Sequence, residues 1–301
     1  MTVTERDLLA QLTATPDDAA VRLVYADWLE QRGDRRGAFL RACDPVWALE
    51  PDHPERLARE AELSRLRVGI DPAWLAVIEP QPADTPSCEC YREAAPRLHR
   101  EVQDTECDGW KRLLDYIERC ADEQRLRFQP RPELPPEDWR HIRTLPPTIA
   151  RLTSITTIEM YGSRLVRLPP EIGQMTSLRS IDFYTSYRLH WYPYELLRCP
   201  ALRGSTASTR TLYGNATNRM VFPALATPGT GVRRPCSVCG APFDDRHAFR
   251  VWLSYRVSND VLPLLVNACS QACVDRLPAP EEGYVAHPHR GGADVVQPKR
   301  R

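Results

Sequence analysis

The first 80 residues carry apolar positions at helical spacing. One face of a helix would hold Val21, Val24, Tyr25, Trp28 and Leu29, which recur at the i, i+3, i+4 and i+7 spacing. Similar stretches give five expected helices, which begin at Thr4, at Asp17 or Asp18, at Asp34, at Pro54 and at Asp71. Residues 1–80 are therefore predicted to be helical.

A repeat replaces this pattern from residue 141. The block Leu145-Pro146-Pro147-Thr148-Ile149 recurs 23 residues later as Leu168-Pro169-Pro170-Glu171-Ile172. It recurs in degenerate form as Tyr192-Pro193-Tyr194-Glu195-Leu196 after 24 more residues. Short alternating apolar stretches lie between the blocks, so residues 141–215 are predicted to form stacked coils, each with one short strand.

Alternation also predicts which side chains of these strands are exposed. Ile158 and Met160 should point inward, whereas their neighbours should point to the opposite face. With the coils stacked in register, Glu159 should lie beside Asp182 and Tyr161 beside Tyr184. Two interpretations stay open for Glu159, Tyr161, Asp182 and Tyr184: a surface that binds a protein partner, because tyrosine gives large contact area at low entropy cost, or an ordinary solvated sheet face.

Four cysteines near the C-terminus have the spacing of metal ligands. Cys236 and Cys239 are separated by two residues, and Cys269 and Cys273 by three. Two such pairs complete the tetrahedral shell of a structural Zn²⁺ ion and leave no position for a substrate. The alternative is a reduced cysteine cluster without metal. Between the pairs, alternation predicts a hairpin with strands at 249–255 and 261–266.

Two stretches resemble known families. The runs Arg22-Leu23-Val24-Tyr25-Ala26-Asp27-Trp28-Leu29-Glu30 and Gly37-Ala38-Phe39-Leu40-Arg41 resemble the bacterial repeat-companion domain, a small helical domain that precedes repeat arrays and has no established activity. For Tyr25, Asp27, Trp28 and Glu30 we favour core and local pairing roles over a docking surface. The Leu-Pro blocks resemble leucine-rich repeats, although Ser163 and Ser186 stand where that family usually has asparagine.

The C-terminal segment resembles treble-clef zinc fingers. Its turn, hairpin and Cys-Ser-x-x-Cys helix carry the likeness, with Ala268 where an aromatic residue is usual. Together these patterns predict an α+β protein of several modules. The expected divisions are a helical repeat-companion domain at 1–80, a Pro-rich linker with a helical segment at 81–140, a leucine-rich-repeat-like array at 141–215, a treble-clef-like zinc finger at 230–280 and a disordered tail at 281–301.

Four other cysteines fall in residues 81–140. Cys88, Cys90, Cys107 and Cys120 match no ligand spacing that we can justify, so scattered buried thiols are favoured over a second metal site. A helix is predicted from Trp110 to Ala121.

Composition narrows the choice of function. Lys+Arg and Asp+Glu both number 40, so no net charge attracts nucleic acid or anionic lipid. No stretch has the apolar length of a membrane helix, and a cytoplasmic protein with reduced thiols is expected. No phosphate loop, nucleophile elbow or His-Glu-x-x-His helix occurs, which favours a non-enzymatic scaffold. The alternative is a nucleic-acid-binding regulator that uses the finger, with a basic surface of Arg233, Arg234, Arg250 and Arg256; a solvated strand face is the simpler interpretation of these arginines.

Overall fold

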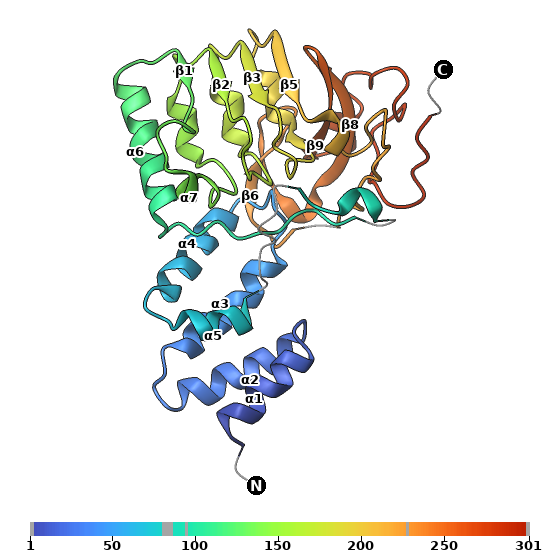
Figure 1. Ribbon diagram of the computed structural model, residues 1–301. Coiled ribbons are helices and arrows are strands. Elements are labelled where there is room, and N and C mark those ends of the chain that lie inside the picture. The colour runs from blue at the N-terminus through green and yellow to red at the C-terminus, as the bar shows by residue number, and fades with distance from the viewer. Residues whose placement is uncertain (1–2, 80–86, 94–95, 227–228, 299–301) are drawn as a thin grey trace. The chain divides into compact units, whose positions relative to one another are not determined.

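The computed structural model describes residues 3–79, 87–93, 96–226 and 229–298 and contains both helices and small sheets (Figure 1). Its contacts divide the chain into two compact units. Unit 1 consists of Met1–Glu50, Glu55–Asp84 and Arg100–Glu106. Unit 2 consists of Pro51–Pro54, Thr85–His99 and Cys107–Arg301.

Unit 1 is helical, as the apolar spacing predicts. Its helices are α1 (Glu5–Ala14), α2 (Ala19–Glu30), α3 (Arg36–Ala48), α4 (Arg56–Arg67) and α5 (Pro72–Ile78). Thr4 forms a capping box with Asp7, and the Asp18 and Asp71 side chains accept amide hydrogen bonds at the starts of α2 and α5. The five predicted helices are thus confirmed, and local capping sets three of their starts.

The core of unit 1 contains Tyr25 of helix α2. Tyr25 is fully buried, donates a hydrogen bond to Glu5 (2.8 Å) and accepts one from Trp74 (3.0 Å). Trp28 packs against the same core. Asp27 and Glu30 both pair with Arg41 on the surface. These contacts agree with the core and pairing roles favoured from the sequence.

A row of parallel strands runs through unit 2. Its order is β1 (Arg127–Phe128), β2 (Thr157–Glu159), β3 (Ser180–Phe183) and β5 (Gly204–Ala207). Thr157 pairs with Ser180 and Ser180 with Gly204, so the register steps by the same 23 and 24 residues as the Leu-Pro blocks. Each block forms a short 3₁₀ helix, namely η2 (Pro147–Arg151), η3 (Pro170–Gln174) and η4 (Tyr194–Arg198).

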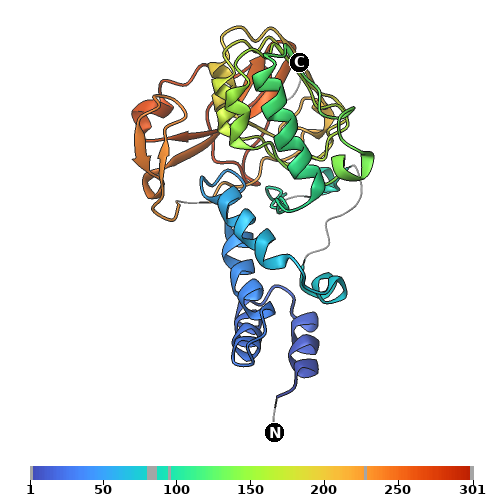
Figure 2. The same cartoon turned by 90° about the vertical axis from the view of Figure 1, so that its left-hand side faces the viewer.

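The segment 81–140 contributes more to unit 2 than a linker would. It supplies the predicted helix as α6 (Asp108–Asp122), a short α7 (Pro136–Trp139) and the first strand of the row, β1, which the sequence pattern did not indicate. Tyr116 of α6 stacks on Phe128 of β1 with ring centroids 5.4 Å apart. α6 therefore covers the β1 end of the row, the end that faces the viewer in Figure 2.

Two serines connect successive coils where an asparagine was the expected residue type. The Ser186 hydroxyl donates to the carbonyl of Met160 (3.0 Å) and accepts from the amide of Ser163 (3.2 Å). The two serine hydroxyls lie 2.8 Å apart, and both residues are 1% exposed. Serine therefore bonds the backbone of the neighbouring coil.

Ser186→Ala should destabilise unit 2 by about 1–3 kcal/mol, because it leaves the buried Met160 carbonyl and the Ser163 amide without this partner. Ser163→Ala should cost less, since the bond from Ser186 to Met160 survives. Urea unfolding followed by hydrogen exchange of the β2 and β3 amides measures both. Equal effects of the two substitutions would contradict this role for Ser186.

A second sheet closes the last coil of the row. It contains β4 (Tyr192–Pro193), β9 (Asp260–Ala268) and β8 (Phe249–Val257), of which β8 and β9 are the predicted hairpin. Ser205 of β5 donates to the carbonyl of Val257 (2.6 Å), and the amide of Ala207 donates to Asp260 (2.8 Å). The apolar-poor coil at β5 is thus completed by the hairpin, which lies at the opposite end of the row from α6 (Figure 1).

The remaining elements are short. They are η1 (Cys90–Arg92), η5 (Thr209–Thr211), β6 (Arg233–Pro235), β7 (Pro242–Asp244), η6 (Asp245–His247) and α8 (Gln271–Val274). None of the helices in the described part of the chain is long and apolar enough to cross a membrane.

The expected disordered tail is anchored to the rest of unit 2 at points within residues 281–298. Val285 and His289 are buried, and His289 exchanges backbone hydrogen bonds with Trp252 of β8 (2.7 and 3.2 Å). The polar composition of the tail concealed these few anchoring residues, so the prediction is wrong for this stretch; residues 299–301 lie outside the described part.

Candidate metal centre

The cysteine quartet, Cys236, Cys239, Cys269 and Cys273, comes from one turn, the end of a strand and a short helix. Cys236 follows β6, Cys239 lies in the turn before β7, Cys269 follows β9 and Cys273 belongs to α8. The turn is closed by the Gly240 amide, which donates to the Cys236 carbonyl (2.9 Å) with Gly240 at φ +75°. The four sulfur atoms lie within 4.8 Å of one another.

The spacing of the sulfurs suits a tetrahedral metal ion. The Sγ atoms of Cys239 and Cys269 lie 3.8 Å apart, and those of Cys269 and Cys273 lie 3.6 Å apart. A metal–sulfur bond of about 2.3 Å implies a tetrahedral edge of about 3.8 Å. A disulfide needs about 2.05 Å, so these contacts are not sulfur–sulfur bonds. The quartet can therefore hold a metal ion with little rearrangement.

Backbone amides point at the sulfur of Cys236, the most buried residue of the quartet. The Cys236 sulfur accepts hydrogen bonds from the amides of Val238 (3.4 Å), Cys239 (3.5 Å) and Cys269 (3.4 Å). Burial opposes ionisation here, but these amides lower the pKa of Cys236 to about 7. Burial raises the pKa of both Cys269 and Cys273. A bound cation would supply the charge that holds all four as thiolates.

Residues outside the quartet fix its first turn. Arg198 of η4 donates to the carbonyls of Cys236 (2.9 Å) and Ser237 (2.8 Å). Ser237 and Asn267 of β9 exchange two hydrogen bonds of 2.9 and 3.0 Å. The turn is thus fastened both to the row of coils and to the hairpin, in the way that outer contacts orient metal ligands.

Arg233, Arg234, Arg250 and Arg256, the alternative basic surface, do not form one exposed patch. Arg250 and Arg234 both pair with Asp52 (2.6 and 3.4 Å), and their side chains are only 8% and 10% exposed. Arg233 and Arg256 are both exposed, and Arg256 pairs with Glu281 (2.5 Å). The solvated strand face is wrong as well, because Arg250, Trp252 and Ser254 are buried. The sequence did not indicate Asp52 as the partner of these arginines.

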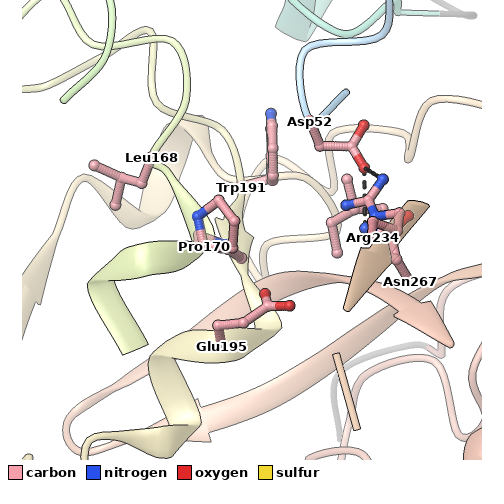
Figure 3. Close-up of a pocket in the computed structure, with 9 residues that line it drawn as sticks. Asp52, Leu168, Pro170, Trp191, Glu195, Arg234 and Asn267 are labelled. Carbon is pink, nitrogen blue, oxygen red and sulfur yellow. Dashed lines mark hydrogen bonds and ion pairs between the residues drawn. The ribbon is translucent and has the colours of Figure 1, made fainter. Parts of the chain in front are cut away.

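Asp52 borders a small hollow in unit 2 (Figure 3). Besides the two arginines, its carboxylate accepts a hydrogen bond from the Asn267 side chain (3.0 Å). Burial disfavours its charge, but Arg250 and Arg234 hold its pKa below the usual range. Glu195 also lines the hollow, and burial raises the pKa of its carboxyl. The space holds about one water molecule, which is too little for a substrate.

The predicted partner-binding residues lie side by side. Glu159 pairs in register with Asp182, and the rings of Tyr161 and Tyr184 lie 6.0 Å apart with exposures of 43% and 50%. Glu159 forms an ion pair with Arg127, and Asp182 accepts the amide of Tyr184 (2.8 Å). The carboxylates are therefore engaged within the chain, whereas the tyrosines present their rings to solvent.

A second cluster brings together residues that sequence reasoning did not group. Cys88 and Cys90 lie with His99 and His190, while Cys107 and Cys120 belong to neither cluster of the described residues. Scattered thiols are thus the wrong interpretation for the first pair. The run Cys-x-Cys followed by His99 was a visible signal, but His190 lies 102 residues beyond Cys88 in sequence.

Comparison with known proteins gave no match to this chain among protein-family models, curated protein sequences or solved structures.

Proposed function

We propose that this protein is a non-enzymatic scaffold that binds a protein partner through the row of parallel strands. The observation that carries the proposal is the exposed pair Tyr161 and Tyr184, which lie side by side in the turns that follow the adjacent strands β2 and β3. The Arg131 guanidinium lies over the Tyr161 ring, 5.2 Å from its centroid. Aromatic and arginine side chains of this kind are enriched where protein interfaces gain most of their energy.

The metal that we propose for the quartet is structural Zn²⁺. A tetrahedral set of four thiolates suits zinc or iron, and four protein ligands leave no open position for a substrate. The hairpin that the quartet borders completes the last coil, through Ser205 and Asp260. In this proposal the ion holds a treble-clef-like finger that closes a scaffold too short to close itself.

We further propose that the row is a short leucine-rich-repeat array and that unit 1 is a repeat-companion domain. The Leu-Pro blocks, the matching register and the 3₁₀ helices support the first assignment. The motif around Tyr25 and Trp28 supports the second. Stacked coils present a rigid surface to partners, which fits the scaffold role.

Nucleic-acid binding through the finger is the less supported alternative. Phosphate contacts require arginines that are free to reach the backbone. Two of the four candidate arginines are buried against Asp52, and a third pairs with Glu281.

The double substitution Tyr161→Ala and Tyr184→Ala should abolish capture of the partner. Loss of an interface hot spot of about 2 kcal/mol weakens binding about 30-fold. Quantitative mass spectrometry of proteins retained by the immobilised full chain, with and without the substitutions, measures the effect. Both side chains are exposed, so the thermal unfolding temperature should not change.

Phe249→Ala is the matched control, because Phe249 is an aromatic residue of unit 2 with 41% exposure outside the row. It should retain the partner. If the tyrosine variant and wild type retain the same proteins in equal amounts, the proposed surface is wrong.

A further inference from the structure

A cluster of two cysteines and two histidines lies in unit 2 away from the quartet. Cys88, Cys90 and His99 come from the short segment 87–99, and His190 comes from the loop before β4. The four candidate ligand atoms all lie within 4.8 Å of one another. Such convergence of residues distant in sequence does not follow from the repeat or from the hairpin.

The cluster has the donor geometry of a four-coordinate metal site. The Cys88 sulfur lies 3.0 Å from Nε2 of His190, and the Cys90 sulfur lies 3.0 Å from Nε2 of His99. Zinc bonds of about 2.3 Å to sulfur and about 2.0 Å to nitrogen set a tetrahedral sulfur–nitrogen edge of about 3.6 Å. An ion at the centre would therefore require shifts of only about half an ångström.

A backbone carbonyl orients the most buried ligand. Nδ1 of His190 lies 2.6 Å from the carbonyl oxygen of Thr211, and the residue is 1% exposed. A carbonyl only accepts hydrogen bonds, so in the neutral ring the proton resides on Nδ1 and the lone pair of Nε2 faces Cys88. Metal-binding histidines are typically held in this way by an outer hydrogen bond.

Apolar side chains shield the cluster. Cys90 belongs to the same buried core as Leu98, Trp191 and Trp252, and Cys88 packs against that core. The two histidine rings meet edge to face, with centroids 4.7 Å apart. Exclusion of water on this side strengthens bonds between an ion and its ligands.

We propose that Cys88, Cys90, His99 and His190 bind a second Zn²⁺ ion. Two thiolates and two imidazoles form a donor set that zinc accepts in tetrahedral structural sites, and the set leaves no position open for catalysis. The ion links residues 87–93 and 96–99, in which η1 is the one regular element that the structure describes, to the loop before β4. Its contribution is to folding, because the ligands converge only in the folded chain.

The number of bound ions tests the proposal directly. Native mass spectrometry of the full chain, purified with zinc and then exchanged into metal-free buffer, should give two zinc ions per chain. Cys88→Ser and Cys239→Ser should each remove one ion, and Cys107→Ser, a half-buried cysteine outside both clusters, should retain two. A folded Cys88→Ser variant that binds as many ions as wild type would overturn the second site.

The variants also separate this proposal from the one for the quartet. If wild type holds one ion that Cys88→Ser loses and Cys239→Ser keeps, the second site stands and the quartet does not bind zinc. The converse pattern leaves the quartet and refutes the second site.

Cobalt titration of the wild-type chain tests the second site without any variant, and therefore does not require that a variant folds. With Co²⁺, thiolate-to-metal absorption should rise over two equivalents, and the two-thiolate site should add half as much as the four-thiolate site. The amides of residues 87–93 and 96–99 should also exchange hydrogen faster once a chelator removes the ions. Saturation at one equivalent, with exchange in these residues unaffected by chelator, would refute the proposal.

Discussion

Cys236→Ser should release the ion that we propose for the quartet and unfold the hairpin end of unit 2. Its sulfur is fully buried and receives three amide hydrogen bonds, so no other group can take its place. Structural zinc contributes about 10–16 kcal/mol of apparent binding energy, which exceeds the net stability of many domains, about 5–15 kcal/mol. Loss of one ligand should lower the free energy of unfolding by several kcal/mol. Each kcal/mol lowers Tm by about 2–4 °C for a unit of this size.

Thermal unfolding and metal content, measured on the same samples, test this expectation. Hydrogen exchange of the β8 and β9 amides assigns the loss to the hairpin. Chelator should reproduce the effect in wild type, since Cys239 is exposed and gives access to the ion.

Cys199→Ser is the matched control. Cys199 is a buried cysteine of the same unit whose thiol donates only to the carbonyl of Ile172 (3.3 Å). A serine hydroxyl can keep that bond, so metal content should not change. Metal-free wild type that unfolds at the same temperature with and without chelator would show that the quartet is a cluster of plain thiols.

Local sequence predicts the parts of the fold that local interactions determine. The caps Thr4, Asp18 and Asp71 act within three residues, and the helices begin where they indicate. Successive Leu-Pro blocks and successive paired strand residues are separated by the same number of residues. This follows because each coil must bring its strand back beside the strand of the previous coil. The quartet was visible because each cysteine pair is close in sequence.

Contacts between residues that are far apart in the sequence could not be predicted from local patterns. β4 pairs with β9 across some 70 residues, and Cys88 meets His190 across 102. The hairpin carries alternating polar residues, which predicts one solvated face. Arg250 is nevertheless buried, because it pairs with Asp52. That partner lies 198 residues away, so no pattern of spacing in the sequence could predict the pair.

Asp52→Asn should destabilise unit 2 by about 3–5 kcal/mol at neutral pH. The substitution leaves Arg250 and Arg234 without their carboxylate, and both are at most 10% exposed. Removal of one partner from a buried ion pair typically has this cost, because the remaining charge stays desolvated. Chemical unfolding, followed through hydrogen exchange of β8 and β9, measures the loss in unit 2 alone.

The pH dependence gives this prediction a second readout. The arginines lower the pKa of Asp52 in the folded state, so its stabilisation is fully present above the unfolded value of about 3.9. It is lost as the pH falls through the lower folded value, because the carboxylate then takes up a proton. The difference in stability between wild type and Asp52→Asn should therefore be constant from pH 7 to 5 and shrink below about pH 4.

Asp244→Asn separates the effect of burial from that of charge pairing. Asp244 pairs with Arg246 at 2.5 Å, but that arginine side chain is 62% exposed. Water replaces the lost partner there, so the loss of stability should be much smaller than for Asp52→Asn. If the two substitutions cost the same, the buried pairs of Asp52 do not stabilise unit 2 more than a surface pair does, and the polar network next to the quartet has no special role in holding β9.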